Sequence, residues 1–213
     1  MAAQLSFLPE SYPDGFHVLR GYVGASQQEQ IYRLTRQLAR VAPFVTPVMP
    51  NGAAFRLEVS SWGPVGWFAD GIGYAYLRFH PATKKPWPVI PDLVWRVLEG
   101  AAREVGYSLR LDTVLVNYYP AEQGSLGAHQ DKNEDDQISP IVTLSLGDGC
   151  RFGMGHVHDK TGMRFTGLDS GDVVVMGGPA RMAYHSVQKL YPGSSKLLKD
   201  GGRLSLTGRK VFL

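Results

Sequence analysis

An H-x-D step just past the middle of the chain, His129-Gln130-Asp131, presents an imidazole and a carboxylate two residues apart. Side chains on an extended backbone alternate between two faces, so His129 and Asp131 would share one face while Gln130 points away. An imidazole and a carboxylate on a common face are two of the three ligands in the 2-His-1-carboxylate triad that holds Fe(II). The step alone is a weak signal, because a polar loop can contain the same residues.

A further histidine, His185, stands in the apolar run from Ala183 to Val187. A lone histidine in such a run is more often a hydrogen-bonded core residue than a ligand. In a chain that also carries an H-x-D step and many short strands, a third metal ligand is the better interpretation. We therefore predict one metal site formed by His129, Asp131 and His185.

Two arginines alternate with leucines near the C-terminus, in the segment RLSLTGR at residues 203–209. The strand period places Arg203 and Arg209 on one face, together with Ser205 and Thr207. Two inward arginines are costly unless they meet anions, and a guanidinium pairs a carboxylate through two parallel hydrogen bonds. The segment predicts a site for one small diacid, with a solvated edge strand carrying surface arginines as the alternative.

Two other segments carry side chains suited to ligand binding. Alternation along residues 114–120 places Asn117 and Tyr119 on one face. Residues 62–76 are broken by glycines and rich in aromatics, including Trp67 and Tyr74. The aromatics could form core, which the residues alone favour, or a flat platform on which a planar ligand such as a base stacks.

Two amphipathic helices are predicted in the first half of the chain. The first covers residues 27–41, after a capping box in which Ser26 caps the helix and Glu29 reaches back to it. Its buried stripe is predicted from apolar residues at helical spacing: Ile31, Leu34, Leu38 and Val41. The second helix runs from Pro91 to Gly106, because proline suits a first turn and glycine a helix end.

Short strands separated by glycine, proline and aspartate turns fill most of the remaining chain. Strands are predicted at 16–19 and 54–59, with a loop over 43–54 that turns at Asn51-Gly52. From residue 111 onward the predicted elements are all strands: 111–119, 141–146, 151–155, 163–168, 172–177, 183–188 and 203–212. We expect a mainly β fold of the α+β class, a jelly roll (double-stranded β-helix) with the N-terminal helices packed on one sheet.

Length and composition favour one domain. The chain has 213 residues, of which 44% are hydrophobic, which suffices for one core. We divide the single domain 1–213 into an N-terminal extension, 1–110, and a jelly-roll core, 111–213. A lone cysteine, Cys150, fits a reducing compartment, and we expect a cytoplasmic monomer without a secretory signal or membrane span. The net charge of +3 leans toward an anionic partner such as nucleic acid.

The order of these motifs resembles the AlkB family of Fe(II)- and 2-oxoglutarate-dependent dioxygenases, which dealkylate nucleic acids. The chain carries N-x-Y at Asn117, H-x-D at His129, the later His185, and R-x-S-x-T-x-R from Arg203. Aromatic and glycine positions upstream, Trp67 among them, extend the resemblance over most of the chain. It is closest to the bacterial members of the family, and it implies that 1–213 is one catalytic domain.

The resemblance implies a role for each motif residue. The catalytic set would be His129, Asp131, His185 and Arg209. The first three of these would bind Fe(II), and Arg209 would lie near the metal-side carboxylate of 2-oxoglutarate. The distal carboxylate of this co-substrate would be bound by residues from two strands: Arg203, Ser205, Asn117 and Tyr119.

The resemblance also implies where a damaged base would lie. Trp67 and His129 would sandwich the base, with Tyr74 and Lys132 near the nucleic-acid backbone. Residues 43–56 would belong to a nucleotide-recognition lid that covers the base.

Three departures from the family pattern affect this assignment. Met176 stands where the bacterial members have tryptophan, which changes packing near the pocket. Ser205 stands where the family usually has asparagine, which alters one hydrogen bond to the co-substrate. Asn133 replaces an acidic residue that helps to read the exocyclic amine of the base. The adjacent Glu134 could substitute for it, whereas Asp135-Asp136 is interpreted as a solvated turn.

The implied reaction is oxidative demethylation of N-alkylated bases, such as 1-methyladenine and 3-methylcytosine, in DNA or alternatively in RNA. O2-dependent decarboxylation of 2-oxoglutarate would be coupled to methyl hydroxylation and formaldehyde release, a direct reversal of alkylation damage. Base-pairing nitrogens are hidden in a duplex, so the base would be flipped out or the strand would be single. The alternatives are a 2-oxoglutarate-dependent hydroxylase of another substrate and a non-catalytic nucleic-acid-binding module.

Overall fold

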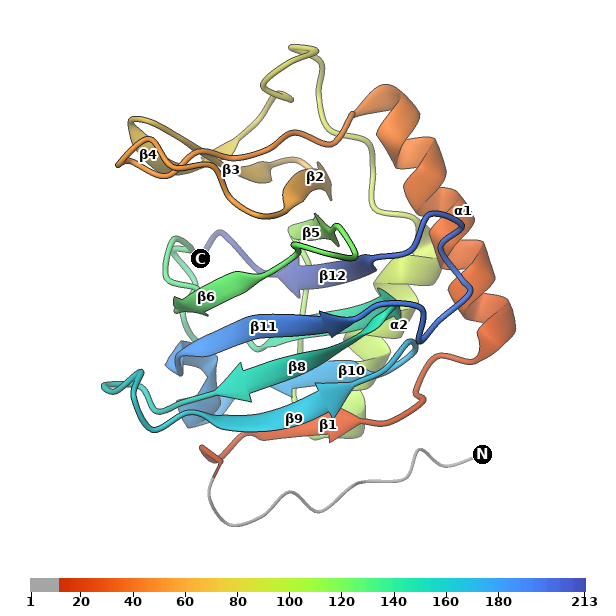
Figure 1. Cartoon of the computed structure of the whole chain (residues 1–213). Coiled ribbons are helices and arrows are strands. Elements are labelled where there is room, and N and C mark those ends of the chain that lie inside the picture. The colour runs from red at the N-terminus through yellow and green to blue at the C-terminus, as the bar shows by residue number, and fades with distance from the viewer. Residues whose placement is uncertain (1–11) are drawn as a thin grey trace.

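Two antiparallel sheets face each other in the computed structural model, which describes residues 12–213 (Figure 1). The larger sheet has six strands, in the order β1 (Phe16–Leu19), β10 (Val173–Met176), β7 (Ile141–Gly147), β12 (Arg203–Arg209), β5 (Thr113–Tyr119) and β2 (Glu58–Trp62). The smaller has four, in the order β6 (Leu126–His129), β11 (His185–Tyr191), β8 (Gly149–Met154) and β9 (Arg164–Leu168). This arrangement confirms the mainly β jelly roll.

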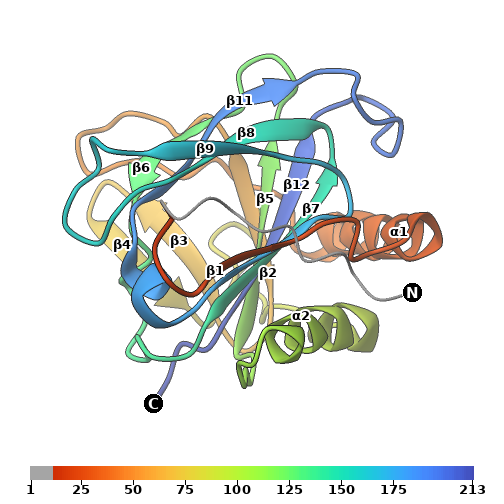
Figure 2. The ribbon, with the colours of Figure 1, turned by 90° about the horizontal axis from the view of Figure 1, so that it is seen from below.

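Both helices, α1 (Ala25–Val41) and α2 (Asp92–Glu104), cover the outer face of the six-stranded sheet, opposite the smaller sheet (Figure 2). Leu98 of α2 is buried in one apolar cluster with Leu204 and Leu206 of β12. Because side chains alternate along a strand, this contact turns Arg203 and Arg209 toward the space between the sheets. The helices therefore fix which face of β12 serves the site.

The start and the buried stripe of α1 differ from the prediction. The helix begins at Ala25 after an uncapped Gly24, so Ser26 already lies inside its first turn and no capping box forms. Glu29 instead bonds Arg33 across one turn, at 2.9 Å. Val41 is exposed. It follows Ile31 by ten residues, and at 3.6 residues per turn this spacing places it about a quarter of a turn away from Ile31 and the buried stripe.

The strand predictions hold best in the second half of the chain, where each predicted strand from 111 onward overlaps an observed one. Upstream, the strand predicted at 54–59 is displaced, because β2 covers Glu58–Trp62. The aromatic segment contains a hairpin that was not predicted, β3 (Gly66–Asp70) and β4 (Gly73–Leu77), which forms its own two-stranded sheet. A 3-10 helix at Gly178–Met182 was also missed.

The N-terminal part contributes to the sandwich itself. Strand β1 pairs with β10 and β2 pairs with β5, so both edges of the six-stranded sheet come from residues before 111. The predicted turn at Asn51-Gly52 is present: Val48 and Ala54 form an isolated bridge around it, and Gly52 has a φ of 84°. No helix within residues 12–213 is long and apolar enough to cross a membrane.

Candidate active site

The three predicted metal ligands converge at one end of the smaller sheet. His129 ends β6 and is the direct cross-strand partner of His185, the first residue of β11. Asp131 follows two residues beyond β6, and its carboxylate oxygens lie 3.6 Å from His129 Nε2 and 3.9 Å from His185 Nε2. One ligand atom from each residue lies within 4.8 Å of the others, a spacing that a single metal ion can bridge.

Backbone carbonyls orient both imidazoles toward this point. His129 Nδ1 is 3.0 Å from the Gly127 carbonyl, and His185 Nδ1 is 3.2 Å from the Ala183 carbonyl. A carbonyl only accepts, so each Nδ1 carries the hydrogen and each Nε2 keeps its lone pair for a metal. Burial and neighbouring positive charge lower the pKa of His185 to about 4, which keeps this imidazole neutral.

The Asp131 carboxylate is held as an anion. Burial opposes its ionisation, but Arg209, the two histidines and Arg181 together hold its pKa well below the usual range. Arg209 Nη2 donates to Asp131 Oδ2 at 2.7 Å, and both side chains are buried. The site therefore offers two imidazole nitrogen ligands and one anionic oxygen ligand.

Arg203 is buried between the sheets, and not all of its N–H groups have a hydrogen-bond partner among the described residues. Its strand, β12, runs between β7 and β5, so the alternative of a solvated edge strand is wrong. The side chain is 1% exposed and donates to Ser145 Oγ at 2.9 Å, while its Nε and Nη1 have no partner among the described residues. A buried cation with free donors needs an anion, which a small diacid would supply.

The other predicted co-substrate residues surround Arg203. In register, Ser205 lies between Asn117 on β5 and Ser145 on β7. The Arg203 guanidinium lies 5.3 Å from the centre of the Tyr119 ring. Burial raises the pKa of Tyr119 to about 12, against the opposing charge of Arg203, so its phenol keeps its proton. These groups can offer hydrogen bonds to the far end of a diacid.

A cavity of about 410 Å³ is lined by two of the metal ligands, His129 and Asp131. The predicted base-contacting residues that line it are Trp67, Tyr74, His129, Lys132 and Asn133. Trp67 stacks on Tyr74, with ring centroids 5.9 Å apart and planes 17° apart, and its Nε1 is 3.5 Å from Asn133 Oδ1. Phe55 and Met49, from the predicted lid, also line the cavity. It thus combines aromatic walls with a metal-ligand floor.

Glu134 does not line this cavity, and the structure gives it other partners. It is 3% exposed, pairs with Arg181 at 3.2 Å and accepts a hydrogen bond from the Tyr76 hydroxyl. Its carboxylate is therefore already engaged and does not replace the missing acid at Asn133. The sequence analysis gave Arg181 and Tyr76 no role, because no local pattern shows that either side chain reaches Glu134.

The prediction of a solvated turn at Asp135-Asp136 is wrong for Asp136. This residue is buried, accepts from the backbone N–H groups of Ile138 and Ser139, and pairs with Lys210 at 3.0 Å. The chain therefore turns around the carboxylate, which explains its burial. Asp135 is exposed, as predicted.

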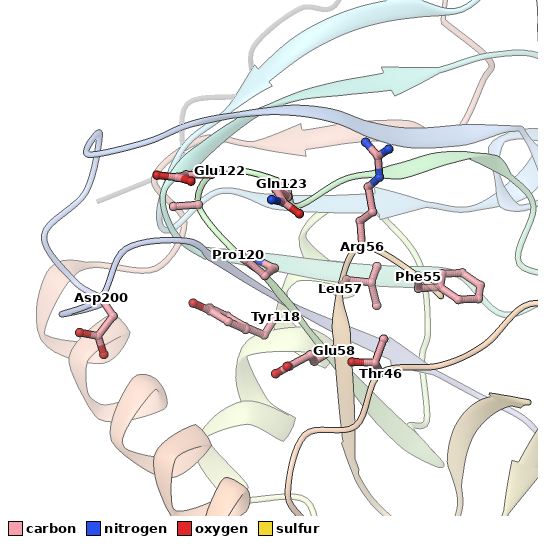
Figure 3. Close-up of a pocket in the computed structure, with 11 residues that line it drawn as sticks. Thr46, Phe55, Arg56, Leu57, Glu58, Tyr118, Pro120, Glu122, Gln123 and Asp200 are labelled. Atoms are coloured by element: carbon pink, nitrogen blue, oxygen red, sulfur yellow. The ribbon is translucent and has the colours of Figure 1, made fainter. Parts of the chain in front are cut away.

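A second cavity, of about 490 Å³, shares Phe55 and Leu57 with the first (Figure 3). Its lining includes three acidic residues, Glu58, Glu122 and Asp200. None of the predicted metal ligands or co-substrate residues lines it. Of these residues, Asn117, His129, Asp131 and Arg209 line the first cavity.

Known proteins are similar in sequence to this chain over nearly its whole length. The family model described as 2OG-Fe(II) oxygenase superfamily matches residues 15–209. The alpha-ketoglutarate-dependent dioxygenase AlkB homolog of Caulobacter vibrioides is 35% identical over 211 residues, 98% of this chain and 93% of that relative. The alpha-ketoglutarate-dependent dioxygenase AlkB of Escherichia coli is 36% identical over 184 residues, 86% of this chain and 84% of that relative. The chain belongs to the 2OG-Fe(II) oxygenase superfamily and, within it, to the AlkB family.

Two further comparisons concern the fold and a named activity. The solved structure of OsALKBH1 superposes with a TM-score of 0.82 at 27% identity, covering 96% of this chain and 100% of that one. A DNA N(6)-methyladenine demethylase of Arabidopsis thaliana, ALKBH1C, is 35% identical over 224 residues, 92% of this chain and 48% of that relative. The protein is thus a 2-oxoglutarate-dependent dioxygenase, with Fe(II) as its metal.

The residues present fit both the metal and the co-substrate. The donor set of two imidazoles and one carboxylate suits Fe(II), since it leaves coordination positions open for other ligands. Arg203 and Arg209 carry buried donors without a partner within residues 12–213, and such donors suit a dicarboxylate. Both sets of groups face the same space between the sheets.

Proposed function

We propose that this dioxygenase removes N-linked methyl groups from nucleic-acid bases, such as 1-methyladenine and 3-methylcytosine, as a direct reversal of alkylation damage. The observation that carries the proposal is the aromatic cavity above the metal ligands, in which His129 is both a ligand and a lining residue opposite the aromatic hairpin. A cavity lined by aromatic side chains and by two of the metal ligands suits a planar base whose methyl group must approach the metal.

In this proposal, His129, Asp131 and His185 hold Fe(II). Arg203, Ser205, Asn117 and Tyr119 hold the distal carboxylate of 2-oxoglutarate. Arg209 would lie near the metal-side carboxylate of 2-oxoglutarate, and the same side chain holds the Asp131 carboxylate. Bound Fe(II), with 2-oxoglutarate and O2, supplies the oxidation: succinate, CO2 and an N-hydroxymethyl base form, and the last releases formaldehyde and the restored base. The protein's own groups bind, orient and shield the reactants.

The remaining residues position the substrate. Trp67 and His129 are proposed to sandwich the extruded base, with Tyr74 and Lys132 next to the backbone of its strand. Residues 43–56 form the lid, which the lining positions of Met49 and Phe55 support. A methyl group on a base-pairing nitrogen weakens pairing, so the lesion itself lowers the cost of base flipping.

We propose DNA as the substrate, single- or double-stranded, which is supported by the name of the Arabidopsis relative as a DNA demethylase. The net charge of +3 favours any polynucleotide, so methylated RNA is tested beside methylated DNA. The whole chain, 1–213, would act as one catalytic domain and as a cytoplasmic monomer. The single buried cysteine, Cys150, fits such a reducing compartment.

The deciding experiment is a panel of methylated oligonucleotides, DNA and RNA, single- and double-stranded, incubated with Fe(II), 2-oxoglutarate and O2. Mass spectrometry should record loss of one methyl group, with one formaldehyde and one succinate formed per base. The variant His185→Ala should abolish the loss, and His158→Ala, in an exposed loop, should not. Succinate release that responds to another substrate, but never to methylated nucleic acid, would replace this proposal by the hydroxylase alternative. Binding of methylated strands without turnover, unchanged in His129→Ala, would favour the non-catalytic module.

A further inference from the structure

A closed ring of hydrogen bonds and ion pairs includes the metal ligand Asp131. Arg209 Nη2 donates to the Asp131 carboxylate at 2.7 Å, and Arg209 Nη1 donates to the Tyr76 hydroxyl at 3.1 Å. Tyr76 in turn donates to Glu134 Oε1, and Glu134 Oε2 pairs with Arg181 at 3.2 Å. Arg181 Nη1 closes the ring by donating to the backbone carbonyl of Asp131 at 2.7 Å. One residue, Asp131, is thus held at its side chain and at its backbone.

Two guanidinium groups and two carboxylates balance the charge of this ring. All four charged members are buried: Arg181, Arg209, Asp131 and Glu134. Buried charges persist only when they are paired and hydrogen-bonded, so removal of one link leaves its neighbours unsatisfied. Burial, partly opposed by Arg209, raises the pKa of Tyr76 far above its ordinary value, so its hydroxyl keeps the proton that it donates.

Tyr76 differs from the other members because it belongs to the aromatic hairpin. On that hairpin, Tyr76 of β4 is the direct cross-strand partner of Trp67 of β3. The hairpin belongs to neither main sheet, so side-chain links such as Tyr76–Arg209 must help to set its position. Trp67 lines the cavity, while its strand partner Tyr76 contacts Arg209, the arginine that holds the metal ligand Asp131.

We propose that Tyr76 is a positioning residue that couples base binding on the hairpin to the orientation of the metal ligand Asp131. This inference rests on the proposed function, because it takes the occupant of the cavity to be a base. A base between Trp67 and His129 fixes the hairpin; Tyr76 then fixes Arg209, and Arg209 fixes the carboxylate. By linkage, a bound base tightens metal binding, and a bound metal tightens base binding by the same factor.

The test measures this coupling as a change in metal affinity. Co(II) is the metal probe, because its binding can be followed without turnover of the substrate. Co(II) affinity is titrated by visible absorption, with 2-oxoglutarate present, with and without an oligonucleotide containing 3-methylcytosine. In the unmodified protein the oligonucleotide should tighten Co(II) binding at least about fivefold. Tyr76→Phe should reduce this factor to less than about twofold, whereas Tyr191→Phe, an exposed tyrosine on β11, should retain it.

Retention of the full factor by Tyr76→Phe overturns the inference, and so does absence of coupling in the unmodified protein. Glu134→Gln is the second variant, in case Tyr76→Phe does not fold. Its amide still accepts from Tyr76 but no longer attracts Arg181 and Arg209, so an intermediate factor is expected. A factor equal to that of the unmodified protein would overturn the inference.

Failure of the proposed function shows differently. In that case no methylated strand in the panel is demethylated, although Tyr76→Phe can still weaken Co(II) binding in the absence of any oligonucleotide. Demethylation together with unchanged coupling in Tyr76→Phe leaves the function standing and removes only the role of Tyr76.

Discussion

His129 and His185 are direct partners across the β6–β11 pairing, and their ring centroids lie 4.2 Å apart. This pairing builds the metal site from two strand ends of the smaller sheet, to which Asp131 adds the third ligand from beyond β6. The side chain of Gln130, between the first two ligands, donates to the carbonyls of Val157 and Met182. It thereby fixes the backbone of the H-x-D step although this step leaves the strand.

Removal of a metal ligand should abolish metal binding without unfolding the protein. His185→Ala deletes one of the two imidazole ligands, and we expect Co(II) affinity to fall more than about 100-fold. Excess metal should raise the melting temperature of the unmodified protein, since a ligand at about 100 times its Kd stabilises by about 2.7 kcal/mol. The variant should lose this rise. Differential scanning fluorimetry with and without Co(II) measures it, and an equal rise in His185→Ala would contradict the assigned ligand.

Replacement of Arg203 should separate co-substrate binding from stability. Arg203→Met removes a buried guanidinium with two unpaired donors, so the free energy of unfolding should not fall and should rise slightly. The affinity for 2-oxoglutarate should drop by about 100-fold, because the distal carboxylate loses its charged partner. Isothermal titration with Co(II) present measures this affinity. The control Arg151→Met alters an exposed arginine on β8 and should leave it unchanged.

Asp136 should make stability depend on acid pH. Burial disfavours its charge, but hydrogen bonds from Ser139, Lys210 and Ile138 outweigh burial and lower its pKa from 3.8 to about 2. A depressed carboxylate pKa adds stability above pH 3.8 and loses it as the pH falls through about 2. Asp136→Asn should therefore lower the free energy of unfolding by about 1 kcal/mol at pH 7, allowing for solvent screening.

Denaturant unfolding at several pH values measures this difference between Asp136→Asn and the unmodified protein. It should shrink as the pH falls from 4 toward 2. Asp135→Asn alters the exposed neighbour and should show no such difference at any pH. A difference that stays constant down to pH 2 would mean that Asp136 acts through packing and not through its charge.

The sequence could predict the site ligands because each motif needs only local geometry. Alternation along a strand is enough to turn Arg203 and Arg209 inward together, and the buried strand β12 confirms it. The network around Glu134 was beyond such reasoning, because Tyr76 and Arg181 reach it from distant parts of the chain. The sequence analysis offered Glu134 as a substitute for the acid that reads the base, whereas this long-range pairing buries it.

The start of the first helix shows the same limit at smaller scale. Ser26 and Glu29 have the spacing of a capping box, but the spacing cannot tell whether the helix begins two residues earlier, after Gly24. The hairpin β3–β4 was missed for another reason: its glycines and aromatics fit a core or a loop as well as strands. Its position depends on contacts such as Tyr76–Arg209, which no local pattern encodes.

The base preference of the cavity should depend on Asn133. The residues that line the cavity include the cations Lys132 and Arg209. The one carboxylate among the lining residues is Asp131, which is already paired with Arg209. No free carboxylate among these residues can accept from the exocyclic amine of a base or balance a cationic base. Asn133→Asp would supply one at the cavity wall.

We therefore expect Asn133→Asp to raise activity on 1-methyladenine and 3-methylcytosine, which are cationic and carry an amine, relative to 1-methylguanine and 3-methylthymine. A hydrogen bond to a charged group is worth about 1.5 kcal/mol or more, so the ratio should change by roughly tenfold. Competition between two methylated oligonucleotides in one tube measures the ratio without error from enzyme concentration. Asn133→Ala, which supplies neither donor nor acceptor, is the matched control, and its ratio should stay near that of the unmodified protein. An equal change in both variants would show that the loss of the amide, and not the gain of charge, controls which base is accepted.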